Sequence, residues 1–471
     1  MPQHTPATHQ IEQHTIYQIP LDHRHGKAGH LFTLWFGANM QLLTIVTGAL
    51  ATTVFGQSFL SAMVAIVVGN LAGGIFMALH AAQGPQLGVP QMVQSRGQFG
   101  SIGAAAVVAL VVFMYAGYFA SGIVVGGQSL HTIATGIDER ISIVGIGVLS
   151  LVATVFGHDL IHLYTRLMTY LCGIALVVCF VWIIFVGGLP AGFAGQGGFS
   201  APGFFGTVSV GALWQISYAP YVSDYSRYLP PVTGPRQAFW ASYTGCVIGS
   251  VLPMGLGALI GLVVTDGDIV GGLSRLTGPA SPVIVILFTL GIAASAAMNL
   301  YCGSLSAITL GQTFWPGWQA GSAARMIVAS LLFLTSILLA LLGEHDFLQN
   351  YTHFIDLLLY VMVPWTAVNL VDFYLVRHGD YDVPSFFRAD GGAYGRYNWP
   401  ALICYGIGIL VQIPFIATDL YVGPIAAALG RVDISWIVGL AVVSPVYYFA
   451  IKAFPGTLAS LPGSVRQALA E

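Results

Sequence analysis

The chain has 471 residues, of which 56% are hydrophobic and 7% are charged, and its formal net charge is −3. The mean hydropathy of +0.80 and the small charged fraction exclude an ordinary soluble protein, in which about a quarter of residues are charged. The nearly neutral balance gives no sign of a nucleic-acid partner. The composition therefore indicates a protein that works in a lipid bilayer.

Twelve apolar runs follow one another along the chain with no soluble domain between them. Most of them approach the roughly 20 residues that a helix needs to cross the hydrocarbon core of a bilayer. We therefore expect an all-α polytopic membrane protein with twelve transmembrane helices. The runs cover residues 31–55, 58–80, 103–130, 141–157, 164–188, 204–221, 238–264, 282–310, 326–342, 353–375, 399–418 and 434–453.

The distribution of Lys and Arg predicts how these helices are oriented. With the N-terminus in the cytosol, 12 of the 15 Lys and Arg residues fall in cytosolic loops and tails, and only Arg140, Arg275 and Arg431 lie outside. Cytosolic loops carry such an excess of positive charge. We expect the plasma membrane, or the inner membrane of a bacterium, with a His-rich tail (1–30) and a C-terminal tail (454–471) both in the cytosol.

The first apolar run is interrupted by polar residues near its middle. The stretch WFGANMQLLT (35–44) places Gly37, Asn39 and Gln41 where lipid would otherwise surround a regular helix. Lipid cannot satisfy the peptide groups of an unwound backbone, so a break must face a ligand, an ion or water. We therefore expect this helix to break beside a binding site.

The sixth apolar run ends in a similar interruption, within WQISYAPYVSDYSRYLPP (214–231). Paired interruptions at corresponding positions of two halves indicate a transporter with inverted repeats and a site near the membrane midplane. Residues 31–188 would form the first five-helix repeat and residues 204–376 the second, inverted one. Residues 399–453 would add two further helices.

Three stretches resemble the nucleobase-cation-symport family, which contains the purine, cytosine, hydantoin and allantoin permeases. They are SYAPYVSDYSRYLP (217–230), WFGANMQ (35–41) and LLLYVMVPWTAVNLVDFYLVRHGDY (357–381), and the first is most similar to purine–cytosine permeases. The resemblance implies a leucine-transporter-like arrangement of five helices plus five inverted helices, with two more. It also implies symport of a heterocyclic substrate with Na⁺ or H⁺, without a cofactor, and it is compatible with a monomer.

The resemblance also implies which aromatic residues bind the substrate. In the family an aromatic residue on the third helix stacks on the substrate ring, and FMYAGYFASG (113–122) places Tyr118 there, with Tyr115 one turn earlier. Tyr118 stands where relatives usually have Trp, so the stacking surface is smaller. On the sixth helix, we expect Trp214 to stack on the ring and Gln215 to read its edge.

Two amide side chains match family positions that hydrogen-bond the ring. Gln41 corresponds to the first-helix Gln, and Asn299, in GIAASAAMNLYCGS (291–304), corresponds to an eighth-helix Asn. An amide offers both a donor and an acceptor, which suits the edge of a purine or pyrimidine. The alternative role for both side chains is hydrogen bonding between helices.

The coupling ion has two candidate sites. In sodium-coupled relatives, carbonyls at the first-helix break and hydroxyls on the eighth helix hold Na⁺; here Gly37 and Met40 would supply the carbonyls and Ser295 the single hydroxyl. A proton would instead need a titratable group, and acids within membrane segments are functional candidates because their insertion is costly. Asp356 is the possible proton site, with a bonded acid near the interface as its alternative role. We expect Asp372 to pair with Arg377.

The leading hypothesis is a cation-coupled permease that imports a purine or cytosine by alternating access. An allantoin or hydantoin permease of the same family is the first alternative. A channel is the second, although the chain has no repeated filter motif. An enzyme is not expected, because the sequence has no HExxH motif and its GQS (127–129) lacks the remainder of a nucleophile elbow.

Overall fold

The computed structural model describes residues 15–24, 26–189, 193–232, 234–264 and 267–454. Residues 1–14 and 455–471 of the two expected tails lie outside this part. Two isolated bridges, Gln57 with Gly198 and Ala417 with Val422, are the only β-pairing within it. The α-helices are α1 (Ala28–Asn39), α2 (Leu42–Thr53), α3 (Phe59–Ala81), α4 (Gly84–Leu87), α5 (Gln91–Phe99), α6 (Ala104–Ile133), α7 (Glu139–Phe156), α8 (His158–Val181), α9 (Ala201–Ile216), α10 (Ala219–Ser226), α11 (Gly234–Val263), α12 (Ile269–Thr277), α13 (Ser281–Phe314), α14 (Ser322–Gly343), α15 (Phe347–Val371), α16 (Trp399–Gln412), α17 (Pro424–Ala428) and α18 (Ser435–Ala453).

Nine helical segments of the described chain are long and apolar enough to cross a bilayer, and the bent pair α1–α2 would make a tenth. The expectation of an all-α protein built from apolar helices is therefore confirmed. The pair α9–α10 is divided into short helices, and α16 is shorter than an ordinary span. The count of twelve stays a prediction.

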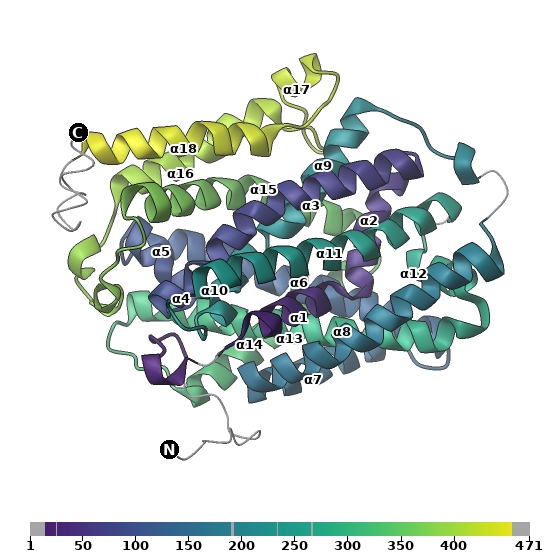
Figure 1. Ribbon diagram of the computed structural model, residues 1–471, viewed down its shortest axis with the longest axis horizontal. Helices are drawn as coiled ribbons and strands as arrows, with labels where there is room; N and C mark the ends of the chain where they lie inside the picture. Colours follow the sequence, from purple (N-terminus) through teal and green to yellow (C-terminus); the bar gives the residue numbers. More distant parts are fainter. Residues whose placement is uncertain (1–14, 25, 190–192, 233, 265–266, 455–471) are drawn as a thin grey trace.

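The helices pack in three groups (Figure 1). In the first group, α1, α2 and α3 pack around α11, whereas α9 and α10 pack on α3. The second group contains α6, α7, α13 and α14, and α8 contacts both α1 and α13. The third group, α15, α16 and α18, forms the upper layer in the view of Figure 1. Segments more than 200 residues apart thus meet at the centre of the molecule.

Glycine allows the closest of these contacts. A Cβ atom on Gly257 of α11 would lie 1.8 Å from the Ile45 carbonyl oxygen of α2, and one on Gly73 of α3 would lie 2.3 Å from the Ala212 carbonyl oxygen of α9. Small residues permit such close approach of helix backbones in a membrane. The helix after the first break, α2, and the helix before the second, α9, are therefore held tightly against the long helices α11 and α3.

One end of the molecule carries residues 15–24, α4, α5 and the segment 377–398, and we call it the terminal face. There the last part of the expected N-terminal tail packs against the helices. The Ile19 N–H donates to the Gly88 carbonyl (2.9 Å), and the Thr15 hydroxyl donates to the Ala320 carbonyl (2.8 Å). The guanidinium of Arg227, at the end of α10, donates to the Thr15 carbonyl (2.9 Å). This stretch therefore ties several helix ends together.

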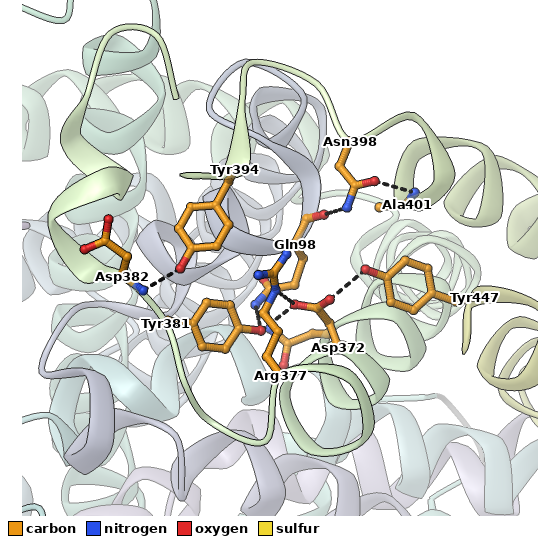
Figure 2. Close-up of polar contacts among 10 residues, drawn as sticks. Gln98, Asp372, Arg377, Tyr381, Asp382, Tyr394, Asn398, Ala401 and Tyr447 are labelled. Carbon is orange, nitrogen blue, oxygen red and sulfur yellow. Dashed lines mark hydrogen bonds and ion pairs between the residues drawn. The ribbon is translucent and has the colours of Figure 1, made fainter. Parts of the chain in front are cut away.

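A buried carboxylate joins the end of α15 to α18 on the same face (Figure 2). Asp372 is fully buried and accepts hydrogen bonds from Arg377 (3.0 Å), Tyr381 (2.5 Å) and Tyr447 (2.8 Å). The expected pairing of Asp372 with Arg377 is confirmed. Gln98 of α5 donates to the Tyr381 hydroxyl (3.1 Å), so the cluster also holds α5 in place.

Candidate substrate site between two helix breaks

The first predicted break is present as an unwound segment between α1 and α2. Met40 has φ −79° and ψ 67°, Gln41 is extended with φ −149° and ψ 162°, and the two helices are bent by 59°. The Met40 N–H bonds to the Gly37 carbonyl (3.0 Å) and the Gln41 N–H to the Asn39 carbonyl (2.9 Å). The polar stretch read from the sequence therefore breaks the helix where it was predicted.

The second predicted break lies between α9 and α10 and is shallower. Ser217 and Tyr218 separate the helices, yet both keep right-handed helical backbone angles. Pro220 has no N–H group, so it cannot donate to the Ile216 carbonyl four residues earlier. The Ser217 hydroxyl donates to the Trp214 carbonyl (2.8 Å) and satisfies another acceptor at this point.

Asn39 joins the two breaks. Its side-chain oxygen accepts hydrogen bonds from the Trp214 indole (2.7 Å), the Ser250 hydroxyl (2.9 Å) and the Tyr218 hydroxyl (3.2 Å). Its amide nitrogen donates to the Trp35 carbonyl (2.7 Å). Because Asn39 is fully buried, these bonds replace contacts that water would otherwise provide. The end of α1 and the end of α9 are therefore fixed relative to each other.

A small cavity lies between the breaks, and we call it the inner cavity. Its free volume is about 20 Å³, which corresponds to roughly one water molecule. A nucleobase would therefore need the surrounding side chains to move apart. The cavity is lined by Gln41, Leu43, Tyr118, Gly122, Trp214, Ser217, Tyr218, Tyr221, Ser295, Ala296, Met298 and Asn299.

Aromatic side chains form much of the wall of the inner cavity. The Tyr118 and Trp214 rings are 6.1 Å apart and nearly perpendicular, and the Trp214 and Tyr218 rings are 5.9 Å apart. The Tyr118 hydroxyl is buried and has no hydrogen-bond partner among the described residues. Tyr218 is followed by Tyr221, whose ring centroid is 5.6 Å away. These rings offer π-surfaces and one open polar group to a flat ligand.

The two predicted amide readers also line this cavity. Gln41 donates to the Ala38 carbonyl (3.0 Å) and to the Ser295 hydroxyl (2.9 Å), and no described residue donates to its side-chain oxygen. Asn299 accepts from the Tyr221 hydroxyl (2.5 Å) and donates to the Ser295 carbonyl (3.2 Å). The Gln41 oxygen is therefore an open acceptor, whereas Asn299 would have to exchange partners to bind a ligand.

Two of the expected substrate residues lie outside the lining. Gln215 donates to Asn70 (2.8 Å) and Ser250 (3.1 Å), so its amide faces α3 and α11. Tyr115 packs edge-on behind Tyr221, with the ring centroids 4.5 Å apart. The structure thus brings four of the six predicted substrate residues to the inner cavity and places these two behind its wall.

Tyr218 and Tyr221 were not singled out from the sequence, although a signal was present. They follow Trp214 by four and seven residues, and this spacing puts side chains on one face of a helix. Because the second break keeps helical backbone angles, this periodicity continues across it. The helical spacing of the aromatic residues could therefore have identified all three.

The oxygens predicted to hold a cation lie around the first break. A Cβ atom on Gly291 of α13 would come within 2.4 Å of the Met40 carbonyl oxygen, so this carbonyl is directed at α13. Ser295, one turn further along α13, has its hydroxyl within 2.9 Å of the Gln41 amide. The Gly37 carbonyl already accepts the Met40 N–H. Carbonyl and hydroxyl oxygens are the ligands that hard cations prefer.

A second, larger cavity opens at the end of the molecule opposite the terminal face, and we call it the vestibule. Its volume is about 670 Å³, and residues of α9, α15 and the segments 54–55 and 417–433 line it. The possible proton site, Asp356, lies here and not in the inner cavity. Leu213 lines the vestibule and the next residue, Trp214, lines the inner cavity, so α9 separates the two.

Relatives with curated names match almost the entire chain. A family described as permease for cytosine/purines, uracil, thiamine and allantoin matches residues 18–439. The putative purine-cytosine permease YxlA of Bacillus subtilis is 41% identical over 444 residues, which cover 94% of this chain and 96% of the relative. The purine-cytosine permease fcyB of Emericella nidulans is 24% identical over 476 residues, with 94% and 90% covered.

Solved structures share the fold. Mhp1, a nucleobase-cation-symport-1 family transporter, in a closed conformation with bromovinylhydantoin bound, has a TM-score of 0.73 and 18% identity, with 97% of this chain and 99% of that chain covered. The inward-facing conformation of Mhp1 has a TM-score of 0.69 and 16% identity, with the same coverage. The resemblance drawn from the three motifs is thus confirmed, and the chain belongs to the family of permeases for cytosine, purines, uracil, thiamine and allantoin, as a transporter and not an enzyme.

Proposed function

We propose that this permease is a symporter that imports a nucleobase, a purine or cytosine, together with a cation. The observation that carries the proposal is the inner cavity, because two helix breaks joined by Asn39 bring aromatic rings and an open amide oxygen to one place. A nucleobase has two π-faces for stacking and an edge of donors and acceptors. The purine-cytosine permeases among the relatives support this substrate class.

In the proposed mode of binding, Tyr118 and Trp214 stack on the base and the Gln41 oxygen accepts a ring N–H. Stacking on an aromatic side chain contributes about 1–3 kcal/mol per base in nucleic-acid binders. Asn299 exchanges its bond with Tyr221 for one to the ring edge. The family member Mhp1 was solved with a hydantoin derivative, so an allantoin or hydantoin substrate is the alternative that a ligand screen distinguishes.

Transport is proposed to follow alternating access, in which the inner cavity opens first to one face and then to the other. The arrangement would be five helices and five inverted helices with two more, the twelve spans having both termini in the cytosol. The vestibule would then face the outside. Substrate and cation must both favour the same closed state, because a ligand shifts an equilibrium only by its differential affinity for the two states.

Two sites are proposed for the coupling ion. Na⁺ would bind the Gly37 and Met40 carbonyls and the Ser295 hydroxyl, and the Met40 carbonyl directed at α13 supports this site. A proton would bind Asp356. Uptake into proteoliposomes driven by a Na⁺ gradient and lost in Ser295→Ala would favour Na⁺; uptake driven by a pH gradient and lost in Asp356→Asn would favour H⁺.

The substrate is tested by a thermal-shift screen of the purified protein against nucleobases, hydantoins and allantoin, with and without Na⁺. A ligand stabilises the folded state by RT ln(1 + [L]/Kd), so the midpoint temperature of unfolding must rise with ligand concentration. We expect purines or cytosine to raise it in the wild type and not in Trp214→Ala. A shift with allantoin or hydantoins alone would contradict the proposed substrate, and uptake that never exceeds the external concentration would indicate a channel.

A further inference from the structure

The vestibule has the dimensions of a small-molecule site. Its volume of about 670 Å³ lies within the roughly 300–1,000 Å³ that such sites occupy. The inner cavity, at about 20 Å³, is closed to a base in the same structure. A heterocycle arriving from this side therefore meets an open site before it reaches a closed one.

An unpaired carboxylate lies in the wall of the vestibule. Asp356 has neither a hydrogen bond nor an ion pair with any other described residue, and it lines this cavity. Arg431 also lines it, but its guanidinium is directed at the Thr418 carbonyl, 3.5 Å away. The Asp356 carboxylate is therefore available to a donor from outside the protein.

The two neighbouring acids are already bonded. Asp419 is 2.9 Å from the His353 ring, and this contact holds the pKa of the Asp419 carboxyl below its usual value. Asp433 accepts the Ala417 N–H (2.9 Å) and the Tyr360 hydroxyl (3.3 Å). His353, Asp356 and Tyr360 share one face of α15. Of the three carboxylates at this cavity, Asp356 alone is open within the described chain.

The part of the vestibule wall that α9 and residues 54–55 form is largely apolar and contains an aromatic ring. A Cβ atom on Gly206 would lie 2.5 Å from the Phe55 ring, so the ring packs on α9 while it lines the vestibule. Ser209, which is 6% exposed, also lines the vestibule, and its hydroxyl lacks a partner within the described residues. An apolar face with separate acceptor and hydroxyl groups suits a flat polar ring better than a bare cation.

We propose that the vestibule is a second binding site for the transported class of heterocycle, in which the Asp356 carboxylate accepts a ring or exocyclic N–H while Phe55 offers a stacking surface. This proposal rests on the proposed function. Only α9 separates this site from the inner cavity, since Leu213 lines the vestibule and the next residue, Trp214, lines the inner cavity. It selects rings that carry N–H donors before the inner cavity opens.

The test is equilibrium binding of radiolabelled adenine and cytosine to the purified protein at fixed pH, without ion or voltage gradients. We expect two phases, a tight one at the inner cavity and a weaker one at the vestibule. Hydrogen bonds to charged groups contribute about 1.5–3 kcal/mol, so Asp356→Asn weakens the second phase at least about tenfold. Caffeine, which has no N–H, does not compete in the second phase.

Thr352→Trp separates this role from proton binding, because the indole obstructs the vestibule while Asp356 is kept. Thr352 lines the cavity, whereas Thr335 lies exposed on α14, so Thr335→Trp is the matched control. For the charge change, the control is Asp346→Asn at the start of α15. We expect Thr352→Trp to remove the second phase and to leave the first unchanged, and both controls to retain the two phases.

The outcomes distinguish this proposal from the proposed function. A single phase in the wild type, or a second phase unchanged in both Asp356→Asn and Thr352→Trp, would overturn the vestibule site while leaving the inner site intact. If Na⁺ or K⁺ alone abolished the second phase, and caffeine competed in that phase as well as adenine does, the vestibule would be a cation site instead. Absence of all binding by adenine and cytosine would refute the proposed substrate class, and with it this inference.

Discussion

The two helix breaks differ in depth. At the first, Met40 and Gln41 leave helical geometry and the chain turns by 59°. At the second, Ser217 and Tyr218 stay helical and only the register of hydrogen bonds is interrupted. The first break therefore exposes more peptide groups and depends on side chains to satisfy them. The second depends chiefly on the missing N–H of Pro220.

The halves beyond the breaks are also held differently. α2 is pressed against α11 through glycine contacts between backbones. α10 is held by hydrogen bonds: Ser223 donates to the His80 carbonyl (3.0 Å), and Ser226 donates to the Ala81 carbonyl (2.7 Å). The hydroxyl groups of α10 can form hydrogen bonds with new partners after a small movement. The backbone of α2 cannot move in this way without separating from α11. We infer that the shallow break is the more adaptable of the two.

The largest effect is expected for Asn39→Leu, which removes the acceptor shared by both breaks. The three donors left behind are buried, and each unsatisfied group costs about 1–3 kcal/mol. We expect a loss of at least about 3 kcal/mol in stability, measured by unfolding of the purified protein. Asn39→Asp keeps an acceptor and should lose less, as should Ser250→Ala, which removes a single donor. Equal losses in all three variants would show that Asn39 does not couple the breaks.

Gly257→Ala should push α2 away from α11. The added methyl would lie 1.8 Å from the Ile45 carbonyl oxygen, and overpacking of this kind costs about 1–3 kcal/mol. The matched control is Gly145→Ala, because nothing lies within 4 Å of a Cβ atom there. Thermal unfolding of both variants tests whether the deep break is braced by backbone contact. An unchanged midpoint for Gly257→Ala would refute that view.

Trp214→Ala and Gln41→Ala remove one binding group at each break. If both breaks contribute to the same site, each variant weakens base binding by about 1–3 kcal/mol, or roughly 5- to 150-fold in Kd. Isothermal titration with the base identified by the screen measures the change, and Trp240→Ala, at an exposed aromatic residue, is the control. Unchanged affinity in both variants would move the substrate site elsewhere.

Pro220→Ala is expected to have the smallest effect on stability. Alanine restores an N–H that can bond to the Ile216 carbonyl, so the helix can continue through the second break. The unfolding midpoint should shift by no more than the equivalent of about 1 kcal/mol. Uptake rates, measured in proteoliposomes, should fall more than binding affinity. A loss of several kcal/mol would show that the shallow break is a structural requirement.

The sequence predicted the parts of the structure that depend on local patterns. Apolar length predicted the helices, and polar residues inside apolar runs predicted both breaks. It did not show the depth of each break, because partners distant in the chain hold the unwound stretch. Asn39 bonds to Ser250 of α11, and Gln41 bonds to Ser295 of α13. Gln215 was expected at the ring edge, yet it bonds to Asn70, a partner that only the packing of α3 on α9 reveals.

Other features depend on tertiary structure alone. The stretch 15–24 is polar and was expected to be part of a tail, but helix ends supply acceptors and donors for its backbone. The vestibule combines α9, α15 and the segment 417–433, which no motif links. Asp356 was recognised as an unusual acid within an apolar run. The cavity it faces became visible only once these distant segments were placed together.

The bonding of Asp372 has a consequence for biogenesis. Tyr447, one of its three donors, lies 75 residues later in the chain. During synthesis the acid and Arg377 therefore reach the membrane before α18 has been inserted, and until then the carboxylate lacks one of its three donors. Insertion of α18 completes that set, so this corner of the nascent permease reaches its full bonding only after the helix that carries Tyr447 has entered the membrane.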